Sequence, residues 1–230
     1  MPSDRRHELD PKMSYQAKIR YQDKGIAERY DQERFSSLLG RWVNHLEKKT
    51  LLNCMRELVP EDTVLDIPLG TGRIAAFLLS HGFQVAGADI SEEMMALAKN
   101  RLRGFPNFMG AYLEDAEHLS FPDGSFDAVV SVRFMLHLPP PVRIKILKEM
   151  KRVARKGLFV AYCVSGFTTE ISKFLQGIGK KSGDLLYPGT KKQMEGEMDE
   201  AGLEIIRDLP MLRFVSEAHY LALRSKRDRD

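Results

Sequence analysis

The chain has few cysteines, no long apolar run and little net charge. Its 230 residues include two cysteines, Cys54 and Cys163, which stand far apart and outside any CxxC pair. That spacing argues against a disulfide framework or a thiolate metal site and indicates a reducing compartment. No stretch approaches the ~18 apolar residues of a membrane span, and the N-terminal MPSDRRHELDPKM lacks an apolar signal-peptide core. We therefore expect a cytoplasmic protein without a membrane-spanning segment.

The charges are nearly balanced. The 35 Lys and Arg residues face 32 Asp and Glu residues, which gives a formal net charge of +3. Nucleic-acid binders draw their affinity from concentrated phosphate neutralisation, so this balance argues against a nucleic-acid partner. Two stretches, Arg143–Lys156 and Arg224–Asp230, are locally basic. Such runs are usually solvated helix faces or chain ends, and we expect both to be exposed.

An N-terminal helical segment precedes the main domain. From Gly25 to Glu57, apolar residues recur at intervals of three and four, which predicts one or two helices packed on the rest of the chain. The apolar stripe consists of Ile26, Tyr30, Phe35, Leu38, Leu39, Trp42, Val43 and Leu46. We assign residues 1–58 to this segment and residues 59–230 to the main domain, the two forming one compact unit.

Strands and helices alternate strictly in the main domain. Buried strands are predicted at Thr63–Ile67, Gln84–Ile90, Asn107–Leu113, Phe126–Val132 and Leu158–Val164. The intervening helices are predicted at Arg73–His81, from the capping Ser91 to Gly104, and from Pro139 to Gly157, the last with Arg152, Arg155 and Lys156 at its negative end. Continuous apolar strands alternating with helices indicate a parallel sheet covered on both faces.

The last third of the chain predicts a change of strand direction. A helix near Thr190–Ala201 is followed by strands at Glu204–Leu209 and Phe214–Leu223, joined by a short turn at Pro210. Two strands so joined favour an antiparallel hairpin. The fold class predicted is a doubly wound α/β protein whose mostly parallel sheet has an antiparallel edge.

Candidate ligand-binding residues stand at four strand ends, because ligands of open parallel sheets bind beyond the carboxyl ends of the strands. In Asp66-Ile-Pro-Leu-Gly70-Thr-Gly72-Arg73, the two glycines let the backbone turn sharply and approach a ligand. Asp89 ends the second strand, where a carboxylate can accept both hydroxyls of a ribose. The other two ends are Glu114-Asp115-Ala116, where an adenine amino group would fall, and Ser131 to His137.

The glycine loop alone fits two classes of cofactor. Gly70-x-Gly72-x-x-Ala75 also satisfies the dinucleotide fingerprint, and an acidic residue ending the second strand is common to both classes. Asp66 distinguishes them, because strands leading into nicotinamide-binding loops normally stay apolar. A carboxylate there can organise the loop and meet a ligand ammonium group. The chain also offers no second domain to carry hydride chemistry.

The segments VLDIPLGTGR, VAGADISEEMMALAKNRL and EDAEHLSFPDGSFDAVVSVRFMLHL resemble class I S-adenosylmethionine (SAM)-dependent methyltransferases, nearest to the UbiE-like group. The resemblance covers about Tyr30 to Leu223 and is strongest from Val64 to Leu138. It implies a Rossmann-like methyltransferase fold with seven strands, the last inserted antiparallel, with SAM as cofactor and a small-molecule methyl acceptor. Pro68 replaces the first loop glycine of the family, and Leu69 stands where a small residue or Cys is frequent.

Residue by residue, the resemblance implies a set of cofactor contacts. It places Asp66, Gly70 and Gly72 around the methionine part of SAM, Asp89 at the ribose hydroxyls, Ile90 on the adenine, Asp115 and Ala116 at the adenine edge, Ser131 near the sulfonium, and Tyr30 in an N-terminal lid. His137 is a candidate base, since methylating a hydroxyl or amine requires a proton to leave, although a lone histidine after an apolar run is more often structural. Arg133 is a candidate partner for an acidic acceptor or the SAM carboxylate.

Three alternatives stay open from the sequence. They are a nicotinamide-dependent oxidoreductase, a catalytically inactive SAM-binding partner subunit, and a nucleic-acid methyltransferase that uses the basic helix. Direct displacement of a methyl group from SAM needs no metal, and the sequence shows no metal-binding cluster. The acceptor is left open among quinones, phenols, lipids, amines and other small metabolites.

Overall fold

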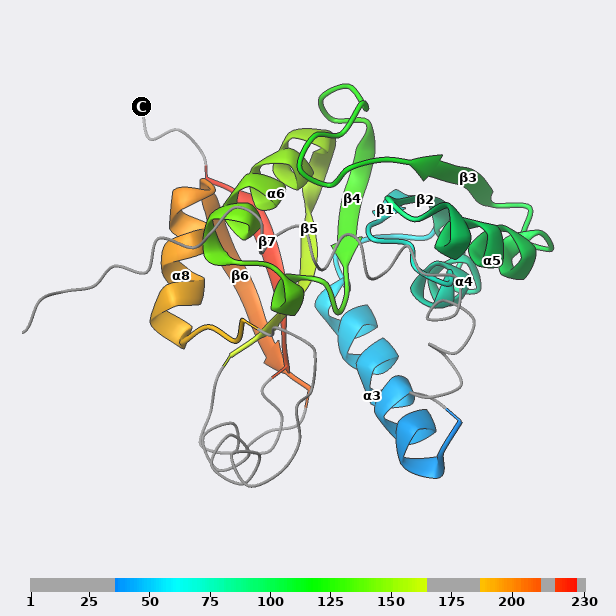
Figure 1. Cartoon of the computed structure of the whole chain (residues 1–230), viewed down its shortest axis with the longest axis horizontal. Coiled ribbons are helices and arrows are strands. Elements are labelled where there is room, and N and C mark those ends of the chain that lie inside the picture. Colours follow the sequence, from blue (N-terminus) through cyan, green and yellow to red (C-terminus); the bar gives the residue numbers. More distant parts are fainter. Residues whose placement is uncertain (1–35, 165–186, 212–217, 227–230) are drawn as a thin grey trace, which may run out of the picture.

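The computed structural model describes residues 36–164, 187–211 and 218–226 (Figure 1). Its strands are β1 Thr63–Asp66, β2 Gln84–Asp89, β3 Phe108–Leu113, β4 Phe126–Ser131, β5 Ala154–Cys163, β6 Leu203–Pro210 and β7 Ala218–Ser225. Its helices are α3 Leu38–Cys54, α4 Arg73–Leu79, α5 Glu92–Leu102, the short 3-10 helix η1 Met135–His137, α6 Pro140–Val153 and α8 Lys191–Glu200.

The strands form one seven-stranded sheet in the order β3-β2-β1-β4-β5-β7-β6. β1 to β5 are parallel to one another, whereas β7 lies between β5 and β6 and is antiparallel to both. α5 lies beside β3 at one end of the sheet, and α8 lies beside β6 at the other (Figure 1). The predicted doubly wound α/β fold with an inserted antiparallel strand is confirmed. The predicted start of the last strand, at Phe214, lies outside the described residues.

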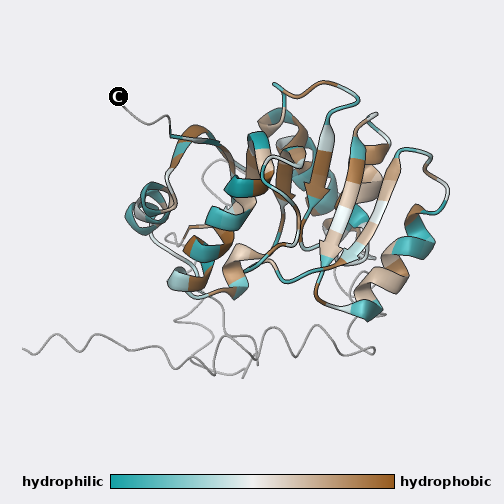
Figure 2. Ribbon diagram, turned by 90° about the horizontal axis from the view of Figure 1, so that it is seen from above, coloured by the Kyte–Doolittle hydropathy of each residue, from teal (hydrophilic) through white to brown (hydrophobic). Residues whose placement is uncertain are grey.

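Each face of the sheet carries its own apolar core. One core joins the strands to α6 and α8, and the other joins them to α3, α4 and α5. The strands between these layers are the most apolar part of the chain, while the outer helix faces are polar (Figure 2). This is the burial expected of a parallel sheet covered on both sides. Among the described helices, none is long and apolar enough to cross a membrane.

Local capping explains where two of the helices begin. Ser91 accepts a hydrogen bond from the Met94 N–H at 3.2 Å and so caps α5, as the sequence predicts. At α8, Thr190 accepts from the Gln193 N–H while the Gln193 side chain accepts from the Thr190 N–H, which forms a complete capping box.

The predicted end of α6 at Gly157 is wrong. The helix ends at Val153, and β5 begins with the next residue. Gly157 lies inside β5, where a Cβ would come within 2.7 Å of the Leu223 carbonyl oxygen in β7. The glycine is therefore required by the close approach of two strands and does not end a helix.

The basic residues after α6 also differ from the prediction. Arg155 and Lys156 belong to β5 and form ion pairs with Asp127 and Asp62, at 3.2 Å and 2.5 Å. At the other end of the stretch, Arg143 is buried, with 2% of its surface exposed, because the Glu197 carboxylate neutralises it. The expectation that the whole stretch forms a solvated helix face is therefore wrong.

Three residues of the apolar stripe predicted for the N-terminal segment do not lie on the packed face of α3. Leu38, Leu39 and Trp42 are 78%, 69% and 49% exposed, in the first turns of α3 that extend away from the sheet (Figure 1). The buried face instead contains Glu47, Leu51 and Cys54 and contacts β6 and β7. Residues 1–35, including Tyr30, lie outside the described residues, so the boundary at residue 58 and the lid stay predictions.

Candidate active site

A pocket lies beyond the carboxyl ends of β1, β2 and β4. The predicted site residues that line it are Asp66, Gly70, Asp89, Ile90, Asp115, Ala116, Arg133 and His137. Gly72 is not part of the wall and caps α4, while Ser131 is fully buried at the end of β4. Parallel strands end at one edge, so residues far apart in the sequence meet here.

The glycine loop between β1 and α4 has a left-handed backbone at both glycines. Gly70 has a φ of 53° and Gly72 a φ of 75°, values that other residues rarely adopt. A Cβ at Gly72 would also crowd Ala98 of α5 at 3.2 Å. Leu69, unusual for the resembled family, lies directly over Gly87 of β2, where a Cβ would collide with its side chain. Gly87 therefore leaves the space that the large side chain of Leu69 needs.

Asp66 is the most buried carboxylate of the pocket. Its side chain is 1% exposed, and its Oδ2 atom has no hydrogen-bond partner among the described residues. Burial raises the pKa of Asp66 well above its ordinary value, while the charge of Arg73 opposes that rise. A pocket carboxylate with an unsatisfied oxygen is suited to a ligand that donates hydrogen bonds or carries positive charge.

Asp89 links the glycine loop to the helix that follows β2. Its Oδ2 atom accepts a hydrogen bond from the Gly70 N–H at 2.7 Å, and its Oδ1 atom accepts from the Ser91 N–H at 3.0 Å. Burial raises the pKa of Asp89, and these backbone donors counteract part of the rise. A carboxylate has about four acceptor sites, so Asp89 can hold the loop and still accept from ligand hydroxyls.

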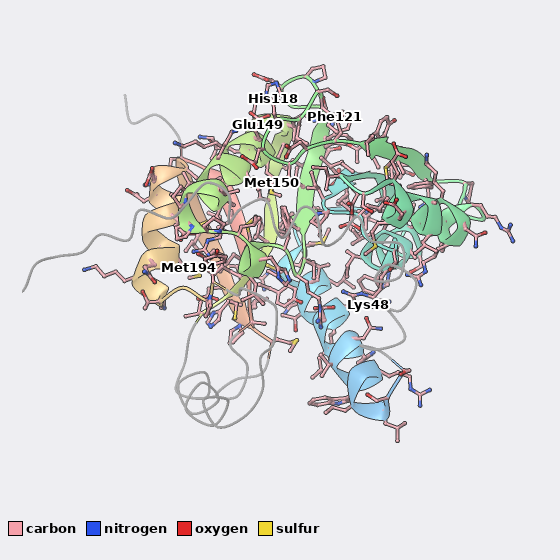
Figure 3. All side chains as sticks on the ribbon, viewed as in Figure 1. Lys48, His118, Phe121, Glu149, Met150 and Met194 are labelled. Carbon is pink, nitrogen blue, oxygen red and sulfur yellow. The ribbon has the colours of Figure 1, made fainter. Side chains whose placement is uncertain are left out.

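The loop after β3 brings Asp115 and Ala116 to the pocket and is held by α6. Leu119 donates its N–H to Glu149 at 3.0 Å, and Arg152 donates to the carbonyls of Leu119 and Phe121 at 2.9 and 2.7 Å. Figure 3 shows Phe121 and Glu149 close to His118 at the top of the view. Arg152 thus fixes the loop that forms part of the pocket. It stands in the last turn of α6, the end at which the sequence predicted it.

Arg133 and His137 both reach the pocket after β4. Arg133 has a φ of 60°, a left-handed conformation that long side chains rarely adopt, and its Nε donates to Glu47 at 2.7 Å. His137 belongs to η1 and is 9% exposed.

The sequence analysis missed several residues of the site. Arg73 and Phe134 stand within predicted strand-end segments but were given no role, and both line the pocket. The apolar residues Leu138, Val142 and Ile146 line it as well. Glu47 of α3 pairs with Arg73 at 2.6 Å and with Arg133. The predicted apolar stripe of this helix does not include Glu47, so the periodicity contained no signal for its burial. In the described parts of the chain, no group of three or more His, Cys, Asp or Glu side chains could hold a metal ion.

The architecture and the pocket define a class. The open seven-stranded sheet with a reversed β7, and the pocket at its carboxyl edge beside a glycine loop, occur in a fold shared with solved methyltransferase structures. Residues 64–157 match the family model described as a methyltransferase domain. This part of the chain is therefore similar to methyltransferase domains.

Comparisons with individual proteins agree with that assignment. Methyltransferase GfsG of Streptomyces halstedii is 37% identical over 97 residues, which cover 41% of this chain and 34% of that protein. A demethylmenaquinone methyltransferase of Beutenbergia cavernae is 35% identical over 132 residues, covering 57% and 51%. The matches thus span about half or less of these relatives' length. A solved structure of magnesium protoporphyrin IX methyltransferase from Synechocystis, with bound S-adenosylhomocysteine (SAH), shares the fold at a TM-score of 0.73. The two sequences are 18% identical, and the match covers 93% of this chain and 100% of that chain.

Proposed function

We propose that the protein is a SAM-dependent methyltransferase that acts on a small-molecule acceptor. The observation that supports the proposal is that Asp66 and Asp89 both line one pocket and stand on either side of Gly70, whose backbone is left-handed. One carboxylate keeps an unsatisfied oxygen and the other is anchored by backbone donors. This arrangement fits a ligand with an ammonium group at one end and ribose hydroxyls further along.

The residues of the pocket fit the cofactor in its separate parts. Asp66 would receive the ammonium group, Asp89 the ribose hydroxyls, and Ile90 and Ala116 the adenine, with Met94 completing the apolar wall. Ser131, whose buried hydroxyl has no hydrogen-bond partner among the described residues, would lie near the sulfonium. Gly70 and Gly72 would let the backbone approach the methionine part.

The chemistry asks the protein for alignment and for exclusion of water. When bound, SAM supplies a methyl group already activated by the sulfonium charge. Phe134, Leu138, Val142 and Ile146 form an apolar wall that can align an acceptor and keep water out. His137, at the same wall, would accept the proton of a hydroxyl or amine acceptor.

The apolar wall also favours an acceptor with a sizeable apolar part. Similar proteins carry names of methyltransferases for demethylmenaquinone and for a phytyl hydroquinone. We extend that class, small and partly apolar molecules, to this chain. The near-even charge and the low cysteine content support an acceptor other than nucleic acid and a cytoplasmic location.

Cofactor selectivity gives the first test of this function. SAM and its demethylated product S-adenosylhomocysteine are expected to raise the melting temperature, because each binds only the native chain, and NAD and NADP are expected to leave it unchanged. At a ligand concentration of 100 Kd the stabilisation amounts to about 2.7 kcal/mol. Differential scanning fluorimetry measures it. Stabilisation by a nicotinamide cofactor and not by SAM would favour the oxidoreductase; binding without methyl transfer from labelled SAM to any of a set of metabolites would favour the inactive partner subunit.

The raised pKa of Asp66 predicts that SAM binding releases a proton. In the ligand-free chain, a raised carboxyl pKa stabilises the fold most below the unfolded pKa, and that stabilisation is lost as the pH rises through the raised pKa. A ligand ammonium beside Asp66 lowers the pKa again, so affinity should increase with pH across that interval.

Calorimetric titrations in two buffers of different ionisation enthalpy measure the proton release. The Asp66→Asn variant, which cannot titrate, is expected to bind more weakly and without proton release. Proton release of equal size in the native chain and in the variant would show that another group is responsible.

A further inference from the structure

The buried face of α3 changes from apolar to polar as the helix approaches the pocket. Leu51 and Cys54 are fully buried in the core that α3 shares with the sheet. Earlier in the same helix, Asn44 and Glu47 occupy the inward positions, and Glu47 is 2% exposed. A helix that only covered the sheet would continue the apolar face, so the polar positions need a separate explanation.

Glu47 joins two arginines that come from different strand ends. Its Oε2 atom lies 2.6 Å from Nη2 of Arg73, which begins α4 directly after the glycine loop. Its Oε1 atom accepts from Nε of Arg133, beyond β4, at 2.7 Å. Asn44 holds Arg73 from a second direction, with its Oδ1 atom 2.6 Å from Nη1. Tyr220 in β7 also contacts this cluster: burial raises the pKa of Tyr220, and the charge of Glu47 and the hydrogen bond from the Tyr220 hydroxyl to Glu47 raise it further.

The cluster brings two guanidinium groups to the pocket. Both contact the one carboxylate of Glu47, and both arginines line the pocket wall. Arg73 is also close enough to Asp66 to oppose the rise in its pKa. One end of the pocket therefore has a carboxylate with an unsatisfied oxygen beside a pair of arginines. This arrangement complements the zwitterionic group of an α-amino acid, in which the ammonium and the carboxylate are attached to the same carbon atom.

Stability alone does not account for this arrangement. A buried ion pair contributes little net free energy, because desolvation offsets the attraction, and apolar side chains of similar volume often stabilise as well or better. Arg133 additionally keeps a left-handed φ of 60°, a strained conformation of the kind found at binding sites. The guanidinium fork is in turn the side-chain group best matched to a carboxylate.

We propose that Glu47 is a positioning residue, which fixes Arg73 and Arg133 from α3 so that they receive the carboxylate of a zwitterionic amino-acid group whose ammonium lies at Asp66. The inference rests on the proposed function, in which that group is the methionine part of SAM. It assigns to α3 a role in ligand selection, since the carboxylate distinguishes an amino acid from a simple amine.

A pair of matched ligands tests the role of Glu47. S-adenosylhomocysteine carries the whole amino-acid group, and S-adenosyl-3-thiopropylamine keeps the adenosine and the amine but lacks the carboxylate. The dissociation constants of both are measured by calorimetry for the native chain and for Glu47→Gln. The variant is expected to bind S-adenosylhomocysteine at least about tenfold more weakly and the decarboxylated analogue within about twofold of the native value, as for loss of a charge-assisted contact.

Two further variants keep the test decisive. Arg133→Met leaves Glu47 paired with Arg73, so it should fold even if Glu47→Gln does not, and it should show the same selective loss. Glu57→Gln removes an ion pair of 2.6 Å that joins the turn after α3 to Arg207 of β6, away from the pocket, and should change neither constant.

The outcomes separate this inference from the proposed function. If the native chain binds neither SAM nor S-adenosylhomocysteine, both are overturned. If the native chain binds S-adenosylhomocysteine, while Glu47→Gln and Arg133→Met weaken both ligands equally or neither, the proposed function stands and the positioning role is overturned. A selective loss of the carboxylate-bearing ligand supports the inference, because a merely structural role of α3 would not depend on that group.

Discussion

The Asp89→Ala variant is expected to lose about 2–3 kcal/mol of SAM affinity, or roughly 30- to 150-fold in Kd. The loss has two sources. The ribose hydroxyls lose their charged acceptor, and the Gly70 and Ser91 N–H groups lose the carboxylate that fixes the glycine loop relative to α5. Because both contributions act on the same pocket, the effect should exceed that of removing a single neutral hydrogen bond.

Calorimetry on folded protein measures the dissociation constant for SAM, and two variants serve as controls. Asp89→Asn keeps one oxygen acceptor and should lose less affinity than Asp89→Ala. Asp123→Ala removes an exposed carboxylate that pairs with Arg152 at 2.8 Å and should leave SAM affinity unchanged. Native affinity in a correctly folded Asp89→Ala protein would remove Asp89 from the cofactor site.

The Glu197→Ala variant is expected to lose about 3–5 kcal/mol of unfolding free energy. Glu197 accepts from Arg143 through both carboxylate oxygens, at 2.6 and 2.9 Å, and from the Tyr162 hydroxyl at 2.5 Å. Removing it leaves Arg143 charged and buried between α6 and α8. Arg143 also donates to the carbonyl of Tyr187 at 2.7 Å, so the loss should loosen the segment that precedes α8.

Urea denaturation measures the free energy of unfolding of this variant. The double variant Arg143→Met, Glu197→Leu should recover most of the loss, because it replaces the ion pair by apolar side chains of similar size. Glu204→Ala, which breaks an exposed pair with Arg224, is the matched control and should cost no more than about 1 kcal/mol. A Glu197→Ala protein as stable as that control would show that Arg143 finds water or another partner.

The sequence predicted the positions where parallel strands end and missed the contacts that join distant elements. Asp66, Asp89 and Asp115 each follow or end a predicted strand, and the geometry of a parallel sheet brings them to one edge without further information. Pairing of Glu47 with Arg133, by contrast, depends on how α3 lies across the sheet. Local periodicity contains no signal for that placement.

Two errors in the helices have the same physical origin. The sequence pattern predicted that Gly157 ends a helix. The structure shows that a glycine is needed there because β5 and β7 lie close together, and no local pattern contains that distance. Leu38, Leu39 and Trp42 have the spacing of a buried stripe, yet they lie on turns of α3 that extend beyond the sheet. Tertiary placement therefore overrode a correct local pattern in both cases.

A crystal structure of the chain with S-adenosylhomocysteine tests the central claim most directly. The account predicts that the ribose hydroxyls bind Asp89, that the adenine lies between Ile90 and the loop carrying Asp115 and Ala116, and that the amino-acid group lies at Asp66. Electron density for the ligand anywhere other than this carboxyl edge of the sheet, or a ribose that does not touch Asp89, would contradict it.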